Sequence, residues 1–169
     1  MRTTVLRWCA TIAVIVLAAS CSGGGGGDRD FVFGGRWLMD LIVTDSNVPA
    51  NPVGTRGPDV LIIDQRGNAV TVWFESTGGD LVLNGPCDGN ARTFTATGVG
   101  TGRYFGSSAT ISGAGIDYDS MSGTFRFTFP AGRFTAGTWV ADLGSRAVLG
   151  AGAAGAGAGV HNLILSAVQ

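Results

Sequence analysis

The strongest constraint on the fold is a two-residue period of apolar side chains that runs from Gly35 to Leu143. It is clearest late in this region, where Met121, Gly123, Phe125, Phe127 and Phe129 alternate with Ser122, Thr124, Arg126 and Thr128. Such alternation is typical of a strand with one buried face and one solvated face. No segment between Arg36 and Leu143 has the helical period. The region therefore predicts an all-β domain.

Eight segments of this kind follow one another along the chain. They are residues 35–43, 60–65, 70–74, 81–83, 92–97, 104–112, 121–129 and 137–143. The connections are short, and the one at Arg66–Asn68 contains the glycine that favours a hairpin. An eight-stranded meander can remove its exposed edges by closing into a barrel. We therefore predict an eight-stranded antiparallel up-and-down barrel over residues 31–143, with the longest connection, Asp45–Gly57, over one mouth.

The N-terminus has the pattern of a secretory signal peptide. Arg2 and Arg7 give it positive charge, and residues 9–19 are apolar apart from one threonine. This apolar segment is shorter than the ~20 residues that span a bilayer, so it predicts a cleaved signal over residues 1–20. In the simplest interpretation the protein is secreted and Cys21 is an incidental thiol.

The residues before Cys21 favour a second interpretation. LAASC resembles the lipobox of bacterial lipoproteins, with Ala18 where leucine is commonest. The resemblance implies an acylated Cys21 as the first mature residue. Two or three acyl chains, at ~0.8 kcal/mol per buried methylene, would hold the protein at the membrane. Ser22 rather than aspartate after the cysteine implies the outer membrane of the cell envelope, if the host has one.

Residues 21–30 are expected to form a tether between lipid and domain, because five consecutive glycines have no side chains to pack. About six residues of this kind reach ~12–15 Å. The barrel domain should therefore lie close to the membrane surface.

The composition excludes several kinds of chemistry. Eleven arginines and no lysine stand against twelve acidic residues, which argues against nucleic acid as a partner. The missing lysine excludes Schiff-base catalysis, and the single histidine and three separate cysteines disfavour a catalytic triad or a zinc site. We therefore expect no enzyme activity, no metal and no cofactor.

Four stretches of the predicted barrel region carry a resemblance to known proteins: GGRW, DQRGNAVTV, DYDSMSGTFRFTF and AGTWVADL. They resemble small bacterial lipoproteins with lipocalin-like or avidin-like up-and-down barrels, over about Gly35–Leu143. The resemblance implies that Trp37 plugs the closed end of the barrel. The chain departs from the lipocalins in two ways. It lacks their cysteine pair, and a Gly/Ala tract stands where their C-terminal helix is expected.

Two functions remain open. The resemblance favours a membrane-anchored envelope lipoprotein that binds a small apolar ligand inside the barrel. The ligand contacts would be Trp37, Phe125, Phe127 and Trp139. The alternative is a structural or protein-interaction lipoprotein whose barrel is filled by the same aromatic side chains, as aromatic residues usually are in a core.

Other residues allow two interpretations each. Asp117 and Asp119 could bind Ca²⁺, but aspartates at this spacing before a strand are more typical of a turn. Cys87 is expected in an exposed turn as a free thiol, with an intermolecular disulfide as the alternative. Trp73 is out of phase with its apolar neighbours, so either it marks a contact surface outside the barrel or the inward assignment of that strand is reversed.

The last 26 residues, 144–169, are interpreted as a Gly/Ala-rich low-complexity tail. Glycine disfavours a helix by ~1 kcal/mol per residue, which makes a spanning helix in this tail a poor interpretation. Its final apolar residues could pack on the barrel or be disordered. His161 is expected to be exposed to solvent.

Overall fold

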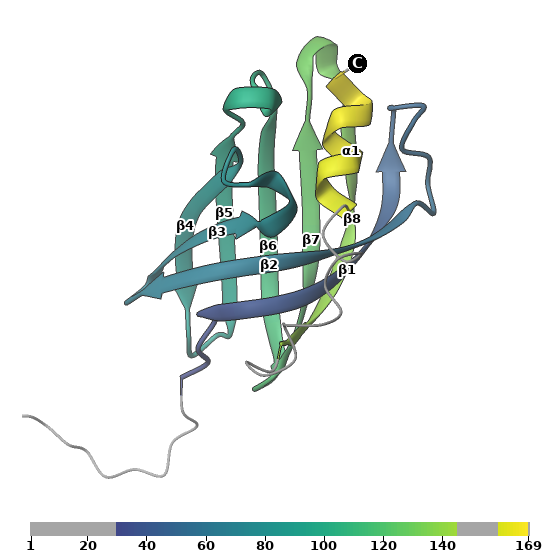
Figure 1. Ribbon diagram of the computed structural model, residues 1–169. Helices are drawn as coiled ribbons and strands as arrows, with labels where there is room; N and C mark the ends of the chain where they lie inside the picture. Colours follow the sequence, from purple (N-terminus) through teal and green to yellow (C-terminus); the bar gives the residue numbers. More distant parts are fainter. Residues whose placement is uncertain (1–29, 145–158, 169) are drawn as a thin grey trace, which may run out of the picture.

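The computed structural model describes residues 30–144 and 159–168. In this part of the chain eight antiparallel strands form a closed barrel, with β8 paired to β1 (Figure 1). The strands are β1 (Gly35–Ser46), β2 (Arg56–Arg66), β3 (Ala69–Phe74), β4 (Val82–Asp88), β5 (Thr93–Val99), β6 (Ser108–Asp117), β7 (Ser120–Thr128) and β8 (Phe134–Leu143). The up-and-down barrel predicted from the sequence is confirmed. The predicted signal peptide, Cys21 and the predicted glycine tether lie outside the described residues.

The faces of the strands follow the alternation in the sequence. On β7, Phe125 and Phe127 are buried while Thr124 and Arg126 are exposed. Two details differ from the prediction. β4 continues to Asp88 through residues predicted as a polar turn, and Leu143, predicted to point inward, is 43% exposed at the end of β8.

Three one-turn 3-10 helices interrupt the connections, at Glu75–Thr77, Gly102–Tyr104 and Pro130–Gly132. The second of them corrects the start of the sixth strand. Tyr104 was predicted to begin that strand, but the chain makes a turn there and β6 begins at Ser108.

The barrel interior is filled largely by aromatic rings that contact one another. Phe125 and Phe127 lie 5.2 Å apart between ring centroids, and Phe127 meets Phe74 edge to face at 6.0 Å. Phe94 lies 6.3 Å from Trp139. Pairs at these separations contribute about 0.5–1.5 kcal/mol beyond the area they bury.

Glycines on neighbouring strands provide the space for these rings. A Cβ atom at Gly113 on β6 would lie 2.3 Å from the Phe94 ring, and one at Gly137 on β8 would lie 2.8 Å from the Phe125 ring. Both distances are shorter than side-chain carbons tolerate. The glycines of β6 and β8 are therefore needed for the packing of the barrel interior.

We expect Gly113→Val to destabilise the protein by about 1–3 kcal/mol or more, because the new side chain overlaps a packed ring. The matched control is Ser112→Val on the outward face of the same strand, which should change stability by less than about 1 kcal/mol. Urea denaturation of both variants makes the comparison. Equal effects would show that the ring does not fill the space at Gly113.

The segment before β1 closes one end of the barrel, which we call the lower end. Phe31 and Phe33 are at most 1% exposed, and the Phe33 carbonyl accepts a hydrogen bond of 2.8 Å from the indole of Trp37. The backbone of this segment is held at both sides: the Phe31 N–H donates to the Gly89 carbonyl at 3.0 Å, and the Phe33 N–H to the Gln65 side chain at 2.7 Å. Trp37 thus lies at a closed end, with the two phenylalanines as part of the plug.

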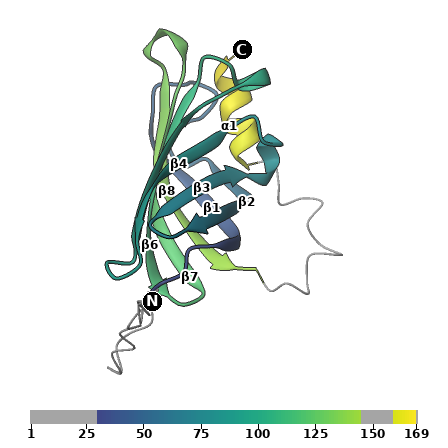
Figure 2. The same cartoon turned by 90° about the vertical axis from the view of Figure 1, so that its left-hand side faces the viewer.

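Helix α1 (Gly159–Val168) closes the opposite, upper end (Figure 2). Four apolar side chains of the helix, Val160, Leu163, Ile164 and Ala167, are buried in the same core cluster as the barrel residues. Of the two alternatives for the end of the tail, packing on the barrel is therefore correct. No helix within the described ranges has the length and apolar character required to cross a membrane.

Candidate functional site at the upper mouth of the barrel

Asp59 holds the first turn of α1 at the upper mouth. This aspartate occupies an inward position on β2 and is 1% exposed. Its carboxylate accepts hydrogen bonds from the backbone N–H of Val160 at 2.9 Å, the N–H of Val60 at 2.7 Å and the Ser76 hydroxyl at 2.5 Å. A carboxylate at a helix N-terminus satisfies an otherwise free N–H and interacts favourably with the helix dipole. Asp59 therefore caps a helix that lies 100 residues further along the chain.

Burial raises the pKa of Asp59 above its ordinary value of 3.8, although the hydrogen bonds from Ser76 and Val160 act in the opposite direction. Desolvation penalises the charged form, whereas donors to the carboxylate favour it. The burial effect is the larger of the two. The folded protein thus holds a proton on Asp59 more tightly than the unfolded chain does.

This shift predicts a pH dependence. With its folded-state pKa raised, Asp59 contributes stability that is fully present below the unfolded pKa and is lost as the pH rises through the folded pKa. We expect the unfolding free energy of the wild type, relative to Asp59→Asn, to fall as the pH rises from about 3 and then to level off above the folded pKa. Urea denaturation of both proteins over this range tests it. A relative stability that increases with pH would contradict the prediction.

A second pair of side chains joins α1 to the barrel. The Tyr104 hydroxyl and the Nδ1 of His161 lie 2.6 Å apart, and burial raises the pKa of Tyr104. The backbone N–H of His161 donates to the Ser76 hydroxyl at 3.3 Å. The expectation that His161 is solvent-exposed is wrong, because the helix brings its ring against the buried tyrosine. Ser76 donates to Asp59 rather than to this ring, so the cluster has the geometry of an anchor and not that of a serine–histidine catalytic pair.

Asn51 holds the middle of the helix. It lies in the connection between β1 and β2, is 2% exposed, and donates to the Leu163 carbonyl at 2.6 Å while accepting from the Ser166 hydroxyl at 2.8 Å. Near the helix start, a Cβ atom on Gly57 would lie 2.8 Å from the Gly159 Cα. The two backbones therefore approach as closely as only glycines permit. The β1–β2 connection does lie at a barrel mouth, as predicted.

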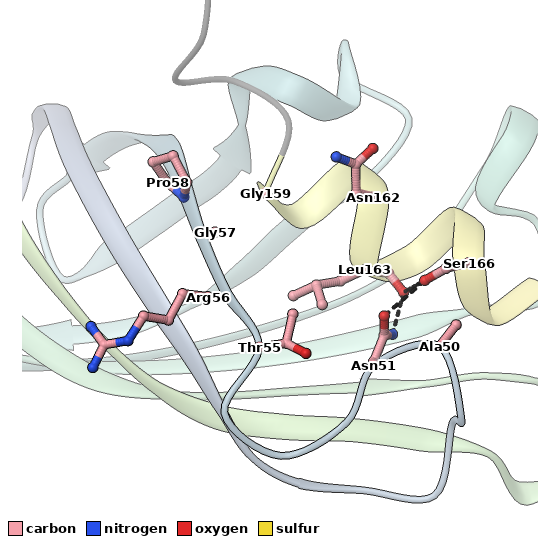
Figure 3. Close-up of a pocket in the computed structure, with 10 residues that line it drawn as sticks. All are labelled: Ala50, Asn51, Thr55, Arg56, Gly57, Pro58, Gly159, Asn162, Leu163 and Ser166. Carbon is pink, nitrogen blue, oxygen red and sulfur yellow. Dashed lines mark hydrogen bonds between the residues drawn. The ribbon is translucent and has the colours of Figure 1, made fainter.

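A hollow of about 330 Å³ lies between α1 and residues 50–58 (Figure 3). Figure 3 shows Leu163 pointing toward Thr55, while the guanidinium of Arg56 points away from the helix. Asn51 and Ser166, two of the polar side chains that line it, are hydrogen-bonded to each other. The hollow therefore has few free polar groups that converge on one point, and its volume is near the lower end of the range for a small-molecule site. Its lining residues are Ala50, Asn51, Thr55, Arg56, Gly57, Pro58, Gly159, Asn162, Leu163 and Ser166.

The four residues predicted to contact a ligand all lie in the core cluster, and each is at most 5% exposed. Phe125 and Phe127 touch each other directly, whereas Trp139 contacts Phe94 and Trp37 contacts Phe31. None of the four lines the hollow beside α1. As ligand contacts they stay a prediction.

Cys87 was expected in an exposed turn, and this is wrong. It lies on β4 and is only 6% exposed. Burial raises the pKa of its thiol, with the charge of Asp88 acting in the same direction. A raised pKa leaves little thiolate at neutral pH, so Cys87 should react slowly.

Asp117 and Asp119 are exposed at the turn between β6 and β7. Among the described residues no group of three or more histidine, cysteine or carboxylate side chains is placed to hold a metal ion. The two aspartates therefore lie at a turn, as the turn interpretation predicts.

Trp73 lies on the outer face of β3, because Val72 and Phe74 on either side of it are buried. It pairs across the sheet with Ile62 on β2 and Val82 on β4. The bridge between Leu81 and Gly100 puts Val99 next in the same line. These four residues form one row across the outer face of the sheet. The inward assignment of β3 is therefore correct.

The described residues thus define a closed eight-stranded up-and-down barrel, plugged at one end by its own N-terminal segment and capped at the other by α1. No protein-family model matches the chain, and no curated protein is significantly similar to it. Among solved structures, it is similar to a variant of the vaccine antigen transferrin binding protein B from Haemophilus parasuis, with 18% identity and a TM-score of 0.38. The match covers 69% of this chain and 28% of that one.

Proposed function

We propose that this protein is a lipid-anchored envelope lipoprotein whose packed barrel acts through its outer surface rather than through a ligand inside it. The observation that carries the proposal is the filled interior. Aromatic rings occupy the lumen, Phe31 and Phe33 close the lower end, and α1 closes the upper end. Of the two functions left open by the sequence, the geometry favours the protein-interaction alternative, and we assign no catalytic role.

The place of the hollows supports this proposal. A small-molecule site usually has a volume of about 300–1,000 Å³. One hollow of about 330 Å³ lies beside α1, and another of about 370 Å³ lies on β5, β6 and β7, lined mainly by outward threonines and serines. Neither lies among the rings of Trp37, Phe125 and Phe127.

The anchor is proposed from the sequence around Cys21, nine positions before the first described residue. Acyl chains on this cysteine would hold the protein at the cell envelope, on the outer membrane if the host has one. The test is Cys21→Ala expressed in the native host. We expect the variant to move from the membrane fraction to the soluble fraction, whereas Cys87→Ala stays with the membrane. A Cys21→Ala protein that remains in the membrane fraction would contradict the anchor.

A fluorescent naphthylamine dye tests the filled lumen separately. Purified full-length protein should not increase the fluorescence of the dye, because a packed core offers it no space. Saturable binding that depends on Phe125 or Phe127 would instead support the ligand-binding alternative.

A further inference from the structure

The lower end of the barrel carries a group of acidic side chains without ion-pair partners. Asp64, Glu75 and Asp80 are each paired with an arginine. Within the described ranges, five other aspartates at the lower end are exposed and take part in no ion pair: Asp30, Asp88, Asp117, Asp119 and Asp142. Among the described residues, Arg92 lies in the turn after β4 close to Asp88, and Arg66 at the end of β2 is paired with Asp64. Among the residues that the structure describes at the lower end, acidic side chains without an ion pair therefore outnumber unpaired basic ones.

Backbone contacts join the segments that carry these aspartates. The N–H of Phe31, next to Asp30, donates to the Gly89 carbonyl in the turn after β4. In the same turn, the Arg92 carbonyl accepts a hydrogen bond of 2.8 Å from the Gly115 N–H. The backbone carbonyl of Asp119 accepts a hydrogen bond of 2.7 Å from the N–H of Leu143, which is next to Asp142. The start of the described chain and the turns after β4 and β6 lie at the same end of the barrel (Figure 2).

Exposed apolar side chains lie within this acidic group. Val32 is 65% exposed between two buried phenylalanines, Ile116 is 54% exposed and Tyr118 is 63% exposed. The Phe31 ring lies against Gly115, which puts Val32 and Ile116 on adjoining segments. The Arg92 guanidinium lies over the Tyr118 ring, 5.8 Å from its centroid. Exposed apolar side chains among charged ones are a feature of protein interaction surfaces.

We propose that this lower surface, formed by Val32, Ile116, Tyr118 and the five aspartates, docks a basic amphipathic segment of a partner protein. The proposal rests on the proposed function, in which the barrel acts through its exterior. The chemistry of the occupant follows from charge complementarity: lysine or arginine side chains would meet the aspartates, and apolar side chains would meet Ile116 and Tyr118. A lipid surface is a poorer match, because five carboxylates are repelled by anionic headgroups.

The place of this surface restricts the partner further. Asp30 stands nine positions after Cys21, and a glycine-rich chain of that length reaches roughly 15–18 Å. An acylated Cys21 would therefore keep the lower surface close to the bilayer. The basic segment of the partner should lie just outside the membrane, within the same distance.

The test uses detergent-purified full-length protein and a dye-labelled 14-residue peptide of leucine and lysine, with a leucine–glutamate peptide for comparison. We expect fluorescence anisotropy to show binding of the lysine peptide alone. The double variant Asp117→Asn/Asp119→Asn should bind it roughly three- to tenfold more weakly. Ile116→Ser/Tyr118→Ser should also weaken it. The matched control, Asp40→Asn/Asp45→Asn, removes two exposed aspartates from β1 and should bind like the wild type.

Three results would overturn the inference. The control variant could lose as much affinity as the Asp117/Asp119 variant, which would indicate net charge alone. The leucine–glutamate peptide could bind equally well. The protein could bind neutral phosphatidylcholine vesicles through Tyr118 and not the peptide, which would indicate a lipid surface. Dye binding inside the barrel would contradict the packed-barrel proposal and would leave the peptide result unchanged, so the two failures are distinguishable.

Discussion

Asp59→Ala lowers the free energy of unfolding by about 2–4 kcal/mol and releases the start of α1 from the barrel mouth. The substitution removes the acceptor of three donors, namely the N–H groups of Val160 and Val60 and the Ser76 hydroxyl. These donors then have no carboxylate to bind. The loss of stability is large because a donor that binds water in the unfolded chain has no hydrogen-bond partner once it is buried in the folded variant. The capping aspartate is thus the polar contact that ties the first turn of α1 to the barrel, while Asn51 and Tyr104 hold later residues of the helix.

Two measurements check this result. Urea denaturation gives the loss of stability, and hydrogen exchange should be much faster at Val160 and Ile164 in the variant than in the wild type. The control is Asp45→Ala, an exposed aspartate of β1 whose removal should change stability by less than about 0.5 kcal/mol. Unchanged exchange in α1 of the Asp59→Ala protein would mean that the cap does not hold the helix.

Trp139→Ala lowers the free energy of unfolding by about 3–5 kcal/mol. The indole is 1% exposed, packs against Phe94 and donates to the Thr124 carbonyl at 3.2 Å. Its removal leaves a cavity lined by apolar side chains, and a cavity of this kind stays dry and accepts small apolar molecules. The variant should therefore bind benzene or xenon, which the wild-type protein excludes.

Trp73→Ala is the matched control, since it removes the same side chain from the outer face. We expect it to cost about 1 kcal/mol or less and to create no binding site. Thermal and urea denaturation measure the stability of both variants, and xenon-induced NMR shifts measure the cavity. Similar losses for the two tryptophans would contradict the account of a tightly packed lumen.

The barrel could be predicted because its signals are local. Alternating side chains set the faces of β1, β3 and β7, and the glycine turn after Arg66 sets a hairpin, all within a few residues of each other. The end of β4 was missed because Gly85 and Pro86 are turn residues in most contexts. Here Gly85 is required by the backbone, since a Cβ atom would lie 1.8 Å from the Thr95 carbonyl oxygen on β5.

The two closed ends could not be predicted by the same reasoning, because they depend on contacts between distant residues. Phe31 and Phe33 precede the first strand, and only the turn at Gly89 and the side chain of Gln65 fix their place. For α1 two signals were present in the sequence. Val160, Leu163, Ile164 and Ala167 have the helical spacing, and Asp59 stands in phase with inward Leu61 and Ile63. A carboxylate in an inward position requires a buried partner, and that partner is the helix.

Native mass spectrometry of the protein purified from its own host tests whether the barrel is filled by its own side chains. We expect one mass, equal to that of the acylated mature chain, which does not change when the activation energy is raised. A reproducible additional mass of a small molecule, lost on activation and absent from a Phe125→Trp variant, would contradict it.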